Sequence, residues 1–324
     1  MVGAPNYEGA RAMSNDSMTA AKRAKNDEFY TQFNDIQKEV NAYREYDADV
    51  FRGKTILLPC DDAEWSEFVQ FFLLNFDRYG LKRLIGTSYN RDGRGKKFDV
   101  SRQVLRAELE YEELEGNGDF RSDEVTRLRD ESDMVITNPP FSLFREFVGW
   151  VKEKQFLILG SINAVTYKEV FPLIKGGKMW AGRTFNQVMI FRQPAPLEDR
   201  KMPGIAWYTN IMHGRRNEAM ELMTMADNLR YNKRLAGTDA YKRYDNFDAI
   251  EVPFSRAIPS DYDGCMGVPI SYLGVHNPDQ FEIVGYIANN DSTLSLRKSN
   301  KASYTAPFID GRRLYARIII RHRR

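Results

Sequence analysis

Short apolar runs and longer amphipathic segments alternate along the first two thirds of the chain. Continuous apolar runs predict buried strands at residues 55–58, 81–87, 134–137 and 156–159. Apolar positions three and four residues apart predict helices over residues 33–46, 65–76, 142–154 and 167–174, and another helix that ends at residue 131. Residues 90–117 are charged and rich in glycine, so we expect mostly loop with one short hairpin. Strands that alternate with helices predict an α/β fold with a doubly wound, mostly parallel sheet.

The pattern changes toward the C-terminus. Two apolar stretches at residues 188–191 and 205–209, joined by a proline-rich loop, predict a terminal antiparallel hairpin. Residues 213–243 are expected to be helical and basic, with short strands later, within residues 264–273 and 314–320. The first 24 residues are small and polar, which predicts a flexible arm. We therefore divide the chain into an arm (1–24), an α/β domain (25–212) and a C-terminal region (213–324).

Composition excludes several classes of protein. The chain has 324 residues and a net charge of only +2. No apolar stretch reaches the ~20 residues needed to span a bilayer, and the N-terminus lacks the apolar core of a signal peptide. Two cysteines and three histidines give neither a disulfide framework nor a metal-binding spacing. We therefore expect a cytoplasmic protein with no membrane association and no bound metal.

The cations are distributed unevenly along this nearly neutral chain. Basic side chains gather after residue 212, where the α/β pattern ends. The candidates for contacts with nucleic-acid phosphates are Arg215, Arg216, Arg230, Lys233 and Arg234. Segregated positive charge is typical of a surface that faces a polyanion. The alternative interpretation is an ordinary solvated basic face.

The most informative chemistry lies directly after the strand at 134–137. There the sequence reads Asn138-Pro139-Pro140-Phe141. Prolines cannot continue a strand, so this tetrapeptide predicts an abrupt turn at the carboxyl end of the strand. Open α/β sheets bind their ligands at that edge. The alternative is a plain turn between a strand and a loop.

The groups in this turn suit a planar amino group. The side-chain oxygen of Asn138 and the carbonyl of Pro139 can each accept one amino hydrogen, and Phe141 offers a stacking face. The amino group of an aromatic base is a poor nucleophile because its lone pair is delocalised into the ring. Two acceptors would localise that lone pair, so that the nitrogen could attack an electrophilic methyl group.

The turn resembles the Asn/Asp/Ser-Pro-Pro-aromatic motif of amino-methyltransferases that use S-adenosylmethionine. Further segments resemble the EcoRI-type adenine-specific DNA methyltransferases in the same order along the chain. They are Asp27–Gln32, Cys60–Asp62, Gly118–Ser122, Thr137–Glu146, Thr166–Phe171, Tyr244–Ile250, Gly264 and Met266–Ile270. The similarity therefore extends from about Lys25 to the C-terminus.

The resemblance implies a fold and a set of cofactor residues. The fold is a Rossmann-like methyltransferase sheet followed by a target-recognition region, for which residues 213–324 are the candidate. The implied cofactor site comprises Phe29, Tyr30, Thr31, Cys60, Asp61, Asp62, Asp119, Phe120 and Asn138. A glycine-rich turn, common in other methyltransferases, is absent around Asp61 and Asp62. An alternative role for Asp61 is capping of the following helix.

The resemblance also implies an activity. We expect methyl transfer from S-adenosyl-L-methionine, with S-adenosyl-L-homocysteine as product, to the amino nitrogen of an adenine flipped out of double-stranded DNA. The enzyme would be a monomer, compatible with a cognate restriction endonuclease that it does not contact directly. Two alternatives remain: an enzyme of the same fold that modifies RNA adenine or a protein glutamine, and a catalytically weakened DNA-binding relative.

Overall fold

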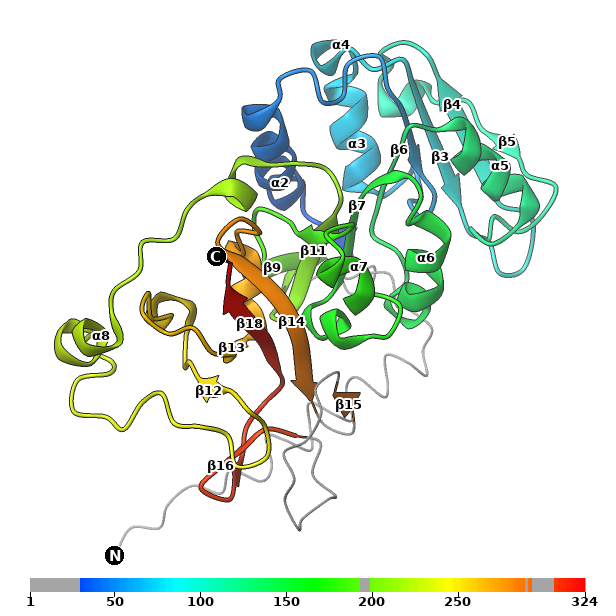
Figure 1. The fold of residues 1–324 in the computed structure, drawn as a ribbon. Helices are drawn as coiled ribbons and strands as arrows, with labels where there is room; N and C mark the ends of the chain where they lie inside the picture. Colours follow the sequence, from blue (N-terminus) through cyan, green and yellow to red (C-terminus); the bar gives the residue numbers. More distant parts are fainter. Residues whose placement is uncertain (1–29, 193–198, 289–290, 293–305, 324) are drawn as a thin grey trace, which may run out of the picture.

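The computed structural model describes residues 30–192, 199–288, 291–292 and 306–323 (Figure 1). The predicted arm and Phe29 lie outside these ranges. Within them, an eight-stranded sheet has the order β5-β4-β3-β2-β6-β7-β11-β8. These strands are β2 (Thr55–Leu58), β3 (Arg83–Ser88), β4 (Lys96–Val100), β5 (Glu112–Glu113), β6 (Met134–Thr137), β7 (Gln155–Ser161), β8 (Trp180–Ala181) and β11 (Ile205–Thr209). The central strands β3, β2, β6 and β7 are parallel, and the flanking strands pair antiparallel.

Helices cover both faces of this sheet. The first set comprises α2 (Phe33–Tyr46), α3 (Glu67–Leu74) and α4 (Phe76–Tyr79), and the second set α5 (Asp123–Glu131), α6 (Phe144–Val151) and α7 (Phe171–Lys175). Side chains alternate along β2: Ile56 and Leu58 join the hydrophobic cluster of α2, α3 and α4, and Leu57 joins that of α5, α6 and α7. A strand that is buried on both faces has a continuous run of apolar residues in the sequence. The α/β class and the double winding are confirmed in outline.

Three predicted helices differ in detail from those observed. The helix expected over 167–174 begins later, at Phe171, and ends at Lys175. The helix expected over 65–76 ends at Leu74 and is followed by the separate turn of α4. The helix expected from residue 142 begins at Phe144, after the 3₁₀ turn η2 (Phe141–Leu143). The amide of Leu143 donates to the carbonyl of Pro140 at 3.0 Å, which holds this tighter turn.

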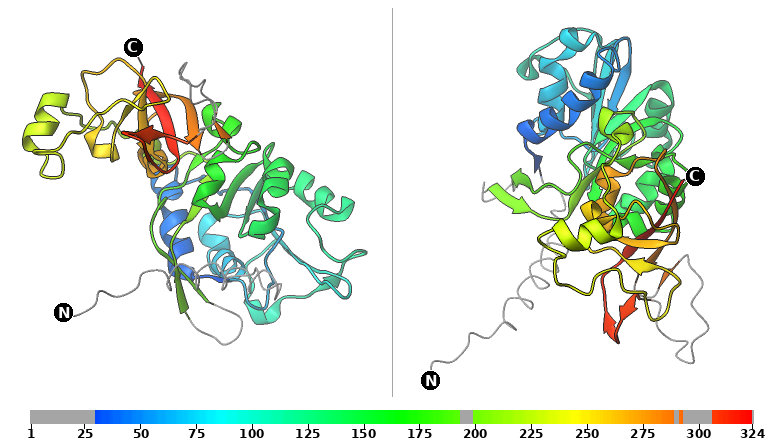
Figure 2. Two further views of the ribbon diagram at one scale, coloured as in Figure 1. Left: turned by 90° about the horizontal axis from the view of Figure 1, so that it is seen from below. Right: turned by 60° about the vertical axis from the view of Figure 1, so that its left-hand side comes forward.

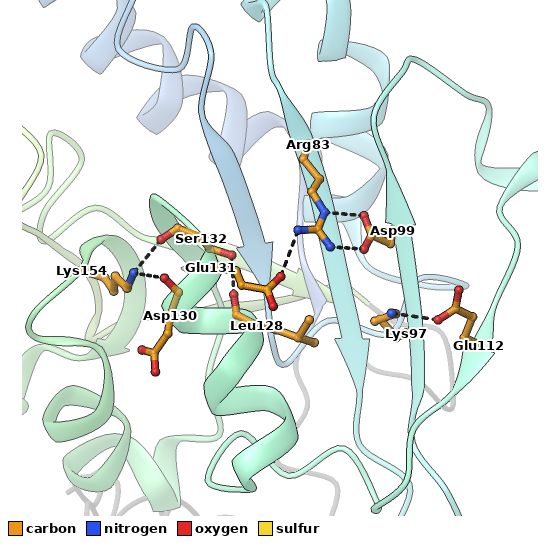
Figure 3. Close-up of polar contacts among 9 residues, drawn as sticks. All are labelled: Arg83, Lys97, Asp99, Glu112, Leu128, Asp130, Glu131, Ser132 and Lys154. Carbon is orange, nitrogen blue, oxygen red and sulfur yellow. Dashed lines mark hydrogen bonds and ion pairs between the residues drawn. The ribbon is translucent and has the colours of Figure 1, made fainter.

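The hairpin expected within residues 90–117 is present as β4 and β5, and it extends the sheet. Arg83, the first residue of β3, donates to both carboxylate oxygens of Asp99 on β4, at 2.8 and 2.5 Å (Figure 3). Arg83 also bonds Glu131 at the end of α5, at 3.1 Å, and Lys97 pairs with Glu112 at 2.8 Å. Because Arg83 lies at the amino end of β3, its contacts leave the opposite edge of the sheet available.

The predicted terminal hairpin is wrong in its pairing. Strand β9 (Met189–Arg192) pairs with β10 (Asp199–Met202) and with β1 (Tyr30–Thr31), in a separate three-stranded sheet of the described residues. Strand β11 lies between β7 and β8 instead. All five residues of β11 are buried, whereas Val188 and Ile190 are 59% and 39% exposed. Burial on both faces requires a place inside the large sheet, and an apolar run alone does not identify a strand's partner.

A buried carboxylate fixes α2 to the segment after β8. Glu39 is fully buried and accepts hydrogen bonds from the amides of Arg183 and Thr184 at 2.7 and 2.8 Å. The hydroxyls of Thr184 and Tyr43 also donate to it, at 2.6 and 2.8 Å. A Cβ at Gly182 would lie 2.3 Å from a Glu39 oxygen, so this close approach requires glycine. The four donors leave the Glu39 carboxylate well satisfied.

The C-terminal region forms its own sheet. In the described residues its strand order is β12-β13-β18-β14-β15, and β16 and β17 form a hairpin. The bounds are β12 (Ile250–Glu251), β13 (Met266–Pro269), β14 (Phe281–Ala288), β15 (Asp291–Ser292), β16 (Phe308–Ile309), β17 (Arg312–Arg313) and β18 (Arg317–His322). Strands β13 and β18 confirm the strands expected within residues 264–273 and 314–320.

The helical segment predicted over residues 213–243 is wrong over most of its length. Only the 3₁₀ turn η4 (Gly214–Asn217) and the short helix α8 (Met225–Tyr231) occur there. Leu235 and Ala236 donate their amides back to Asn232 in a tight turn, and Gly237 has a φ of +72°. Asparagine and glycine favour such turns over a continued helix.

The two sheets share a hydrophobic core. Phe171 of α7 packs edge-on against Tyr286 of β14, with ring centroids 4.6 Å apart. The cluster that contains α5, α6 and α7 continues into the C-terminal sheet through Met266 and Ile318. The C-terminal sheet therefore packs beside the α7 side of the eight-stranded sheet (Figure 2).

Candidate active site

Hydrogen bonds from buried side-chain hydroxyls connect the carboxyl ends of three central strands. The hydroxyl of Thr87, on β3, donates to the carbonyl of Pro59, just after β2, at 3.0 Å. The hydroxyl of Thr137, the last residue of β6, donates to Oδ2 of Asp61 at 2.6 Å. The hydroxyl of Ser66 donates to Oδ1 of Asp61 at 2.7 Å. The loop after β2 is therefore held against the strand that leads to Asn138.

The alternative role of Asp61 as a helix cap is wrong. Ser66 caps α3, because its side-chain oxygen accepts from the amides of Phe68 and Val69. Asp61 is only 6% exposed, and each of its carboxylate oxygens accepts a hydroxyl from the protein. Asp62, by contrast, is half-buried and accepts the amide of Glu64 at 2.8 Å. Asp62 therefore offers a ligand more accessible surface than Asp61 does.

The Asn138–Phe141 turn follows β6 as the sequence predicts. Thr137 is fully buried, Asn138 is half-buried, and Pro139 is buried. Phe141 is partly exposed and packs against the cluster of α2, α3 and α4. Thr137 and Pro139 therefore anchor the turn in the core, while Asn138 and Phe141 are each partly exposed and the side-chain oxygen of Asn138 is itself buried.

The loop that contains Asp119 packs against the carboxyl end of β3. Gly118 has a φ of +80°, and a Cβ there would lie 2.2 Å from the carbonyl oxygen of Ser88. The guanidinium of Arg121 donates to both oxygens of Asp119, at 2.9 and 2.6 Å, and to Glu146 of α6 at 2.7 Å. The hydrogen bonds from Arg121 hold the pKa of the Asp119 carboxyl below its usual value. Asp119 is therefore a fixed carboxylate close to the start of α6.

Two other candidates, Phe120 and Cys60, pack into the hydrophobic core. Phe120 is 3% exposed, with ring centroids 5.0 Å from Phe147 and 5.5 Å from Trp150. Cys60 is half-buried and packs against the same cluster. A small cavity of ≈ 10 Å³ lies between the ends of β2 and β3, with a lining that includes Asp61, Asp62, Ser88, Lys96 and Tyr111. It is about the size of one water molecule.

The segment Phe29–Thr31 of the implied cofactor site is described only in part, because Phe29 lies outside the described residues. For Tyr30 the structure describes the backbone, which pairs with Arg192 in the register of β1 and β9. Thr31 is 3% exposed, and its hydroxyl has no hydrogen-bond partner among the described residues. A buried polar group without a partner costs about 1–3 kcal/mol, so such a hydroxyl is a candidate for a ligand contact. Strand β1 packs against α3.

The five basic candidates do not form one cluster. Arg215 donates to the carbonyl of Arg183 at 3.0 Å, and Arg216 lies 4.1 Å above the ring of Trp180. Burial lowers the pKa of both guanidinium groups. Arg230 and Arg234 lie over aromatic rings, at 5.0 and 5.1 Å, and Lys233 is exposed. The set therefore divides into two half-buried arginines at the junction with β8 and three cations on or after α8.

A groove of ≈ 870 Å³ lies between residues 215–223, α8 and the turn η5 (Ser255–Ala257). Its lining includes the cations Arg215 and Arg256, but also the acids Glu218 and Glu221. Because acids and cations both line the groove, the groove as a whole does not favour a polyanion. The exposed cations Arg230, Lys233 and Arg234 are not part of the lining of this groove.

The hydroxyl network is the part of the site that sequence reasoning missed. Thr87, Thr137 and Ser66 carry it. A signal was present, because Thr137 is a polar residue at the end of an otherwise apolar strand and directly precedes Asn138. The partner across the sheet could not be identified from the sequence, since Asp61 lies 76 positions away.

The described residues hold neither a candidate metal site nor a helix that could cross a membrane. No group of three or more histidine, cysteine, aspartate or glutamate side chains is arranged to hold a metal ion there. In the same part of the chain, every helix is too short or too polar to cross a membrane. The candidate active site consists of the carboxyl ends of β2, β3 and β6 with their loops, which the hydroxyl network joins.

Comparison with known proteins defines the class to which this fold and site belong. The family model described as the adenine-specific methyltransferase EcoRI matches residues 17–323. The chain belongs to this family, and it is an adenine-specific DNA methyltransferase of the Type II, restriction–modification kind.

Individual relatives cover nearly the whole chain. Type II methyltransferase M.MpnI of Mycoplasma pneumoniae is 36% identical, over 94% of this chain and 97% of its own length. M.MgeORF184P of Mycoplasma genitalium is 36% identical, over 93% and 97%. M.EcoRI of Escherichia coli is 34% identical, over 94% and 99%. No solved structure matches the chain.

Proposed function

We propose that this chain methylates the exocyclic amino nitrogen of an adenine that is flipped out of duplex DNA. The observation that carries the proposal is the Asn138–Phe141 turn at the carboxyl end of β6, next to the Asp62 and Asp119 loops. A base inside the duplex cannot reach such a turn, so flipping is required. S-adenosylmethionine, when bound, supplies an electrophilic methyl group.

The residues of the turn have distinct roles in this proposal. The side-chain oxygen of Asn138 and the carbonyl of Pro139 accept the two amino hydrogens of the adenine, which localises the nitrogen lone pair. Pro140 fixes the extended backbone of the turn, and Phe141 stacks on the base. Positioning and fixed dipoles then provide most of the rate enhancement.

The residues near the loops after β2 and β3 fit a cofactor that carries an ammonium, a carboxylate and ribose hydroxyls. Asp62 and Asp119 offer carboxylate acceptors, and the buried Thr31 hydroxyl is a donor that lacks a partner among the described residues. Tyr30 and Phe29 would close over the methionine end, with Phe120 and Cys60 behind the pocket wall. The proposal leaves Asp61 out of direct contact with the cofactor.

A direct test is incubation of the purified chain with duplex DNA and S-adenosylmethionine that carries a labelled methyl group. Digestion to nucleosides followed by mass spectrometry should detect N6-methyladenine. Label in RNA or in a glutamine side chain, with none in DNA, would favour the alternative substrates. Absence of label in every substrate would favour the remaining alternative, a catalytically weakened DNA-binding relative.

Asp62→Ala should weaken S-adenosylmethionine binding by at least tenfold. That factor corresponds to ~1.4 kcal/mol, which is modest for the loss of a charge-assisted hydrogen bond. Titration calorimetry measures the affinity, and Asp49→Ala is the control, since Asp49 pairs with Arg52 on an exposed loop. Normal binding by Asp62→Ala would place the cofactor on other loops.

The C-terminal region from residue 213 is proposed to hold the DNA. Lys233→Gln combined with Arg234→Gln should lower DNA affinity and reduce the slope of log K against log salt by roughly one unit per lost phosphate contact. Fluorescence anisotropy at several salt concentrations measures both quantities. Arg52→Gln with Lys82→Gln is the matched control, because these exposed residues precede β2 and β3 at the edge opposite the catalytic turn. Equal slopes for both double variants would contradict the assignment.

A further inference from the structure

The hydrogen bond between Thr137 and Asp61 spans the two strands that the proposed reaction depends on. Thr137 ends β6 and directly precedes Asn138. Asp61 belongs to the loop after β2, beside the cofactor candidate Asp62. Their contact, at 2.6 Å, is buried and joins residues 76 positions apart in the sequence. It is therefore a direct connection between the cofactor loop and the catalytic turn.

The rest of the network holds Asp61 in place. The Ser66 hydroxyl donates to Oδ1 of Asp61 at 2.7 Å, while its oxygen accepts two amides at the start of α3. The Asp61 side chain is thus fixed by the helix on one side and presents Oδ2 to Thr137 on the other. Thr137 is fully buried and Ser66 is 4% exposed, so water competes little for these bonds.

We propose that Asp61 and Thr137 are positioning residues for methyl transfer. Together they fix the backbone at the carboxyl end of β6, and so set the position of the acceptors on Asn138 and Pro139. The inference rests on the proposed function and deepens it, since it assigns to the first aspartate of the Cys60–Asp62 motif a role toward the catalytic turn. Small displacements of such acceptors are costly because the geometry must match the transition state closely.

Thr137→Val and Thr137→Ser form a matched pair that tests this role. Valine keeps the shape of threonine but removes the hydroxyl, whereas serine keeps the hydroxyl. In the full-length protein, Thr137→Val should lower the single-turnover rate of adenine methylation at least tenfold, with the affinity for S-adenosylmethionine within threefold of wild type. Thr137→Ser should retain the rate within threefold. If Thr137→Val does not fold, Thr137→Ala takes its place with the same expected result. Alanine also lacks the hydroxyl, and it has no γ-methyl group that would press against the Asp61 carboxylate.

The double variant shows whether Asp61 and Thr137 act on the methylation rate through one shared contact or independently. Asp61→Ala combined with Thr137→Val should be no slower than the slower of the two single variants, because each removes the same connection. Additive losses would overturn the proposal. A rate for Thr137→Val within twofold of wild type would also overturn it, as would a loss of cofactor affinity equal to the loss of rate.

Hydrogen exchange provides a readout that does not require activity. In the cofactor-free protein, Thr137→Val should speed amide exchange in the peptide that covers residues 138–145, and Thr137→Ser should not. If the wild-type chain forms no N6-methyladenine, the proposed function fails, but this exchange difference still decides whether the network holds the turn. Unchanged exchange in Thr137→Val would overturn the inference on its own.

Discussion

Asn138→Ala is expected to lower the rate of adenine methylation by about 30- to 1,000-fold. The substitution removes one of the two acceptors for the amino hydrogens, which corresponds to a loss of about 2–4 kcal/mol of transition-state stabilisation. The affinity for S-adenosylmethionine should change little, because the proposed partner of Asn138 is the adenine. Single-turnover kinetics with duplex DNA, together with calorimetry of cofactor binding, measure the two effects separately.

Asn138→Asp is the matched control for this experiment. Aspartate retains an acceptor oxygen at the same position, so this variant should be faster than Asn138→Ala even though it adds a charge. The assigned mechanism would be wrong if Asn138→Ala methylated adenine within a few-fold of wild type.

Glu39→Ala should lower the free energy of unfolding by about 3–5 kcal/mol. The variant leaves the amides of Arg183 and Thr184 and two hydroxyls without their acceptor, and each unsatisfied buried donor costs about 1–3 kcal/mol. Urea denaturation followed by circular dichroism gives this free energy. Glu45→Ala, an exposed position on the same helix, should change it by less than about 0.5 kcal/mol. Equal stabilities for the two variants would show that the Glu39 contacts contribute little.

The central strands could be predicted from the sequence because each is an apolar run buried on both faces. The predictions at 55–58 and 134–137 have the same bounds as β2 and β6. Strand partners could not be predicted in the same way. Residues 205–209 are apolar enough for the interior, but hydrophobicity does not say whether the neighbour is β7 or β9. That choice depends on tertiary packing across the sheet.

The residues of the candidate site likewise divide into those that the sequence could locate and those whose roles it could not assign. The Asn138–Phe141 turn could be located because proline chemistry and strand burial act locally. The roles of adjacent acids could not be separated, since Asp61 and Asp62 look alike in the sequence. The difference arises from two hydroxyl donors that the fold brings to Asp61, one of them from β6. The cations proposed to contact DNA are the hardest to assign from the sequence, because partial burial of Arg215 and Arg216 depends on contacts with Arg183 and Trp180.

The hydrophobic cluster shared by α7 and the C-terminal sheet affects how sequence specificity can diversify in this enzyme. A recognition module can be exchanged between relatives only if its removal does not expose apolar surface. Here a cut at residue 212 would separate Phe171 from Tyr286 and open a common core. On the proposal that the C-terminal region recognises DNA, new target sequences are expected to arise by substitution and insertion in the surface segments between the C-terminal strands, and catalysis and recognition would be inherited as one cooperative unit.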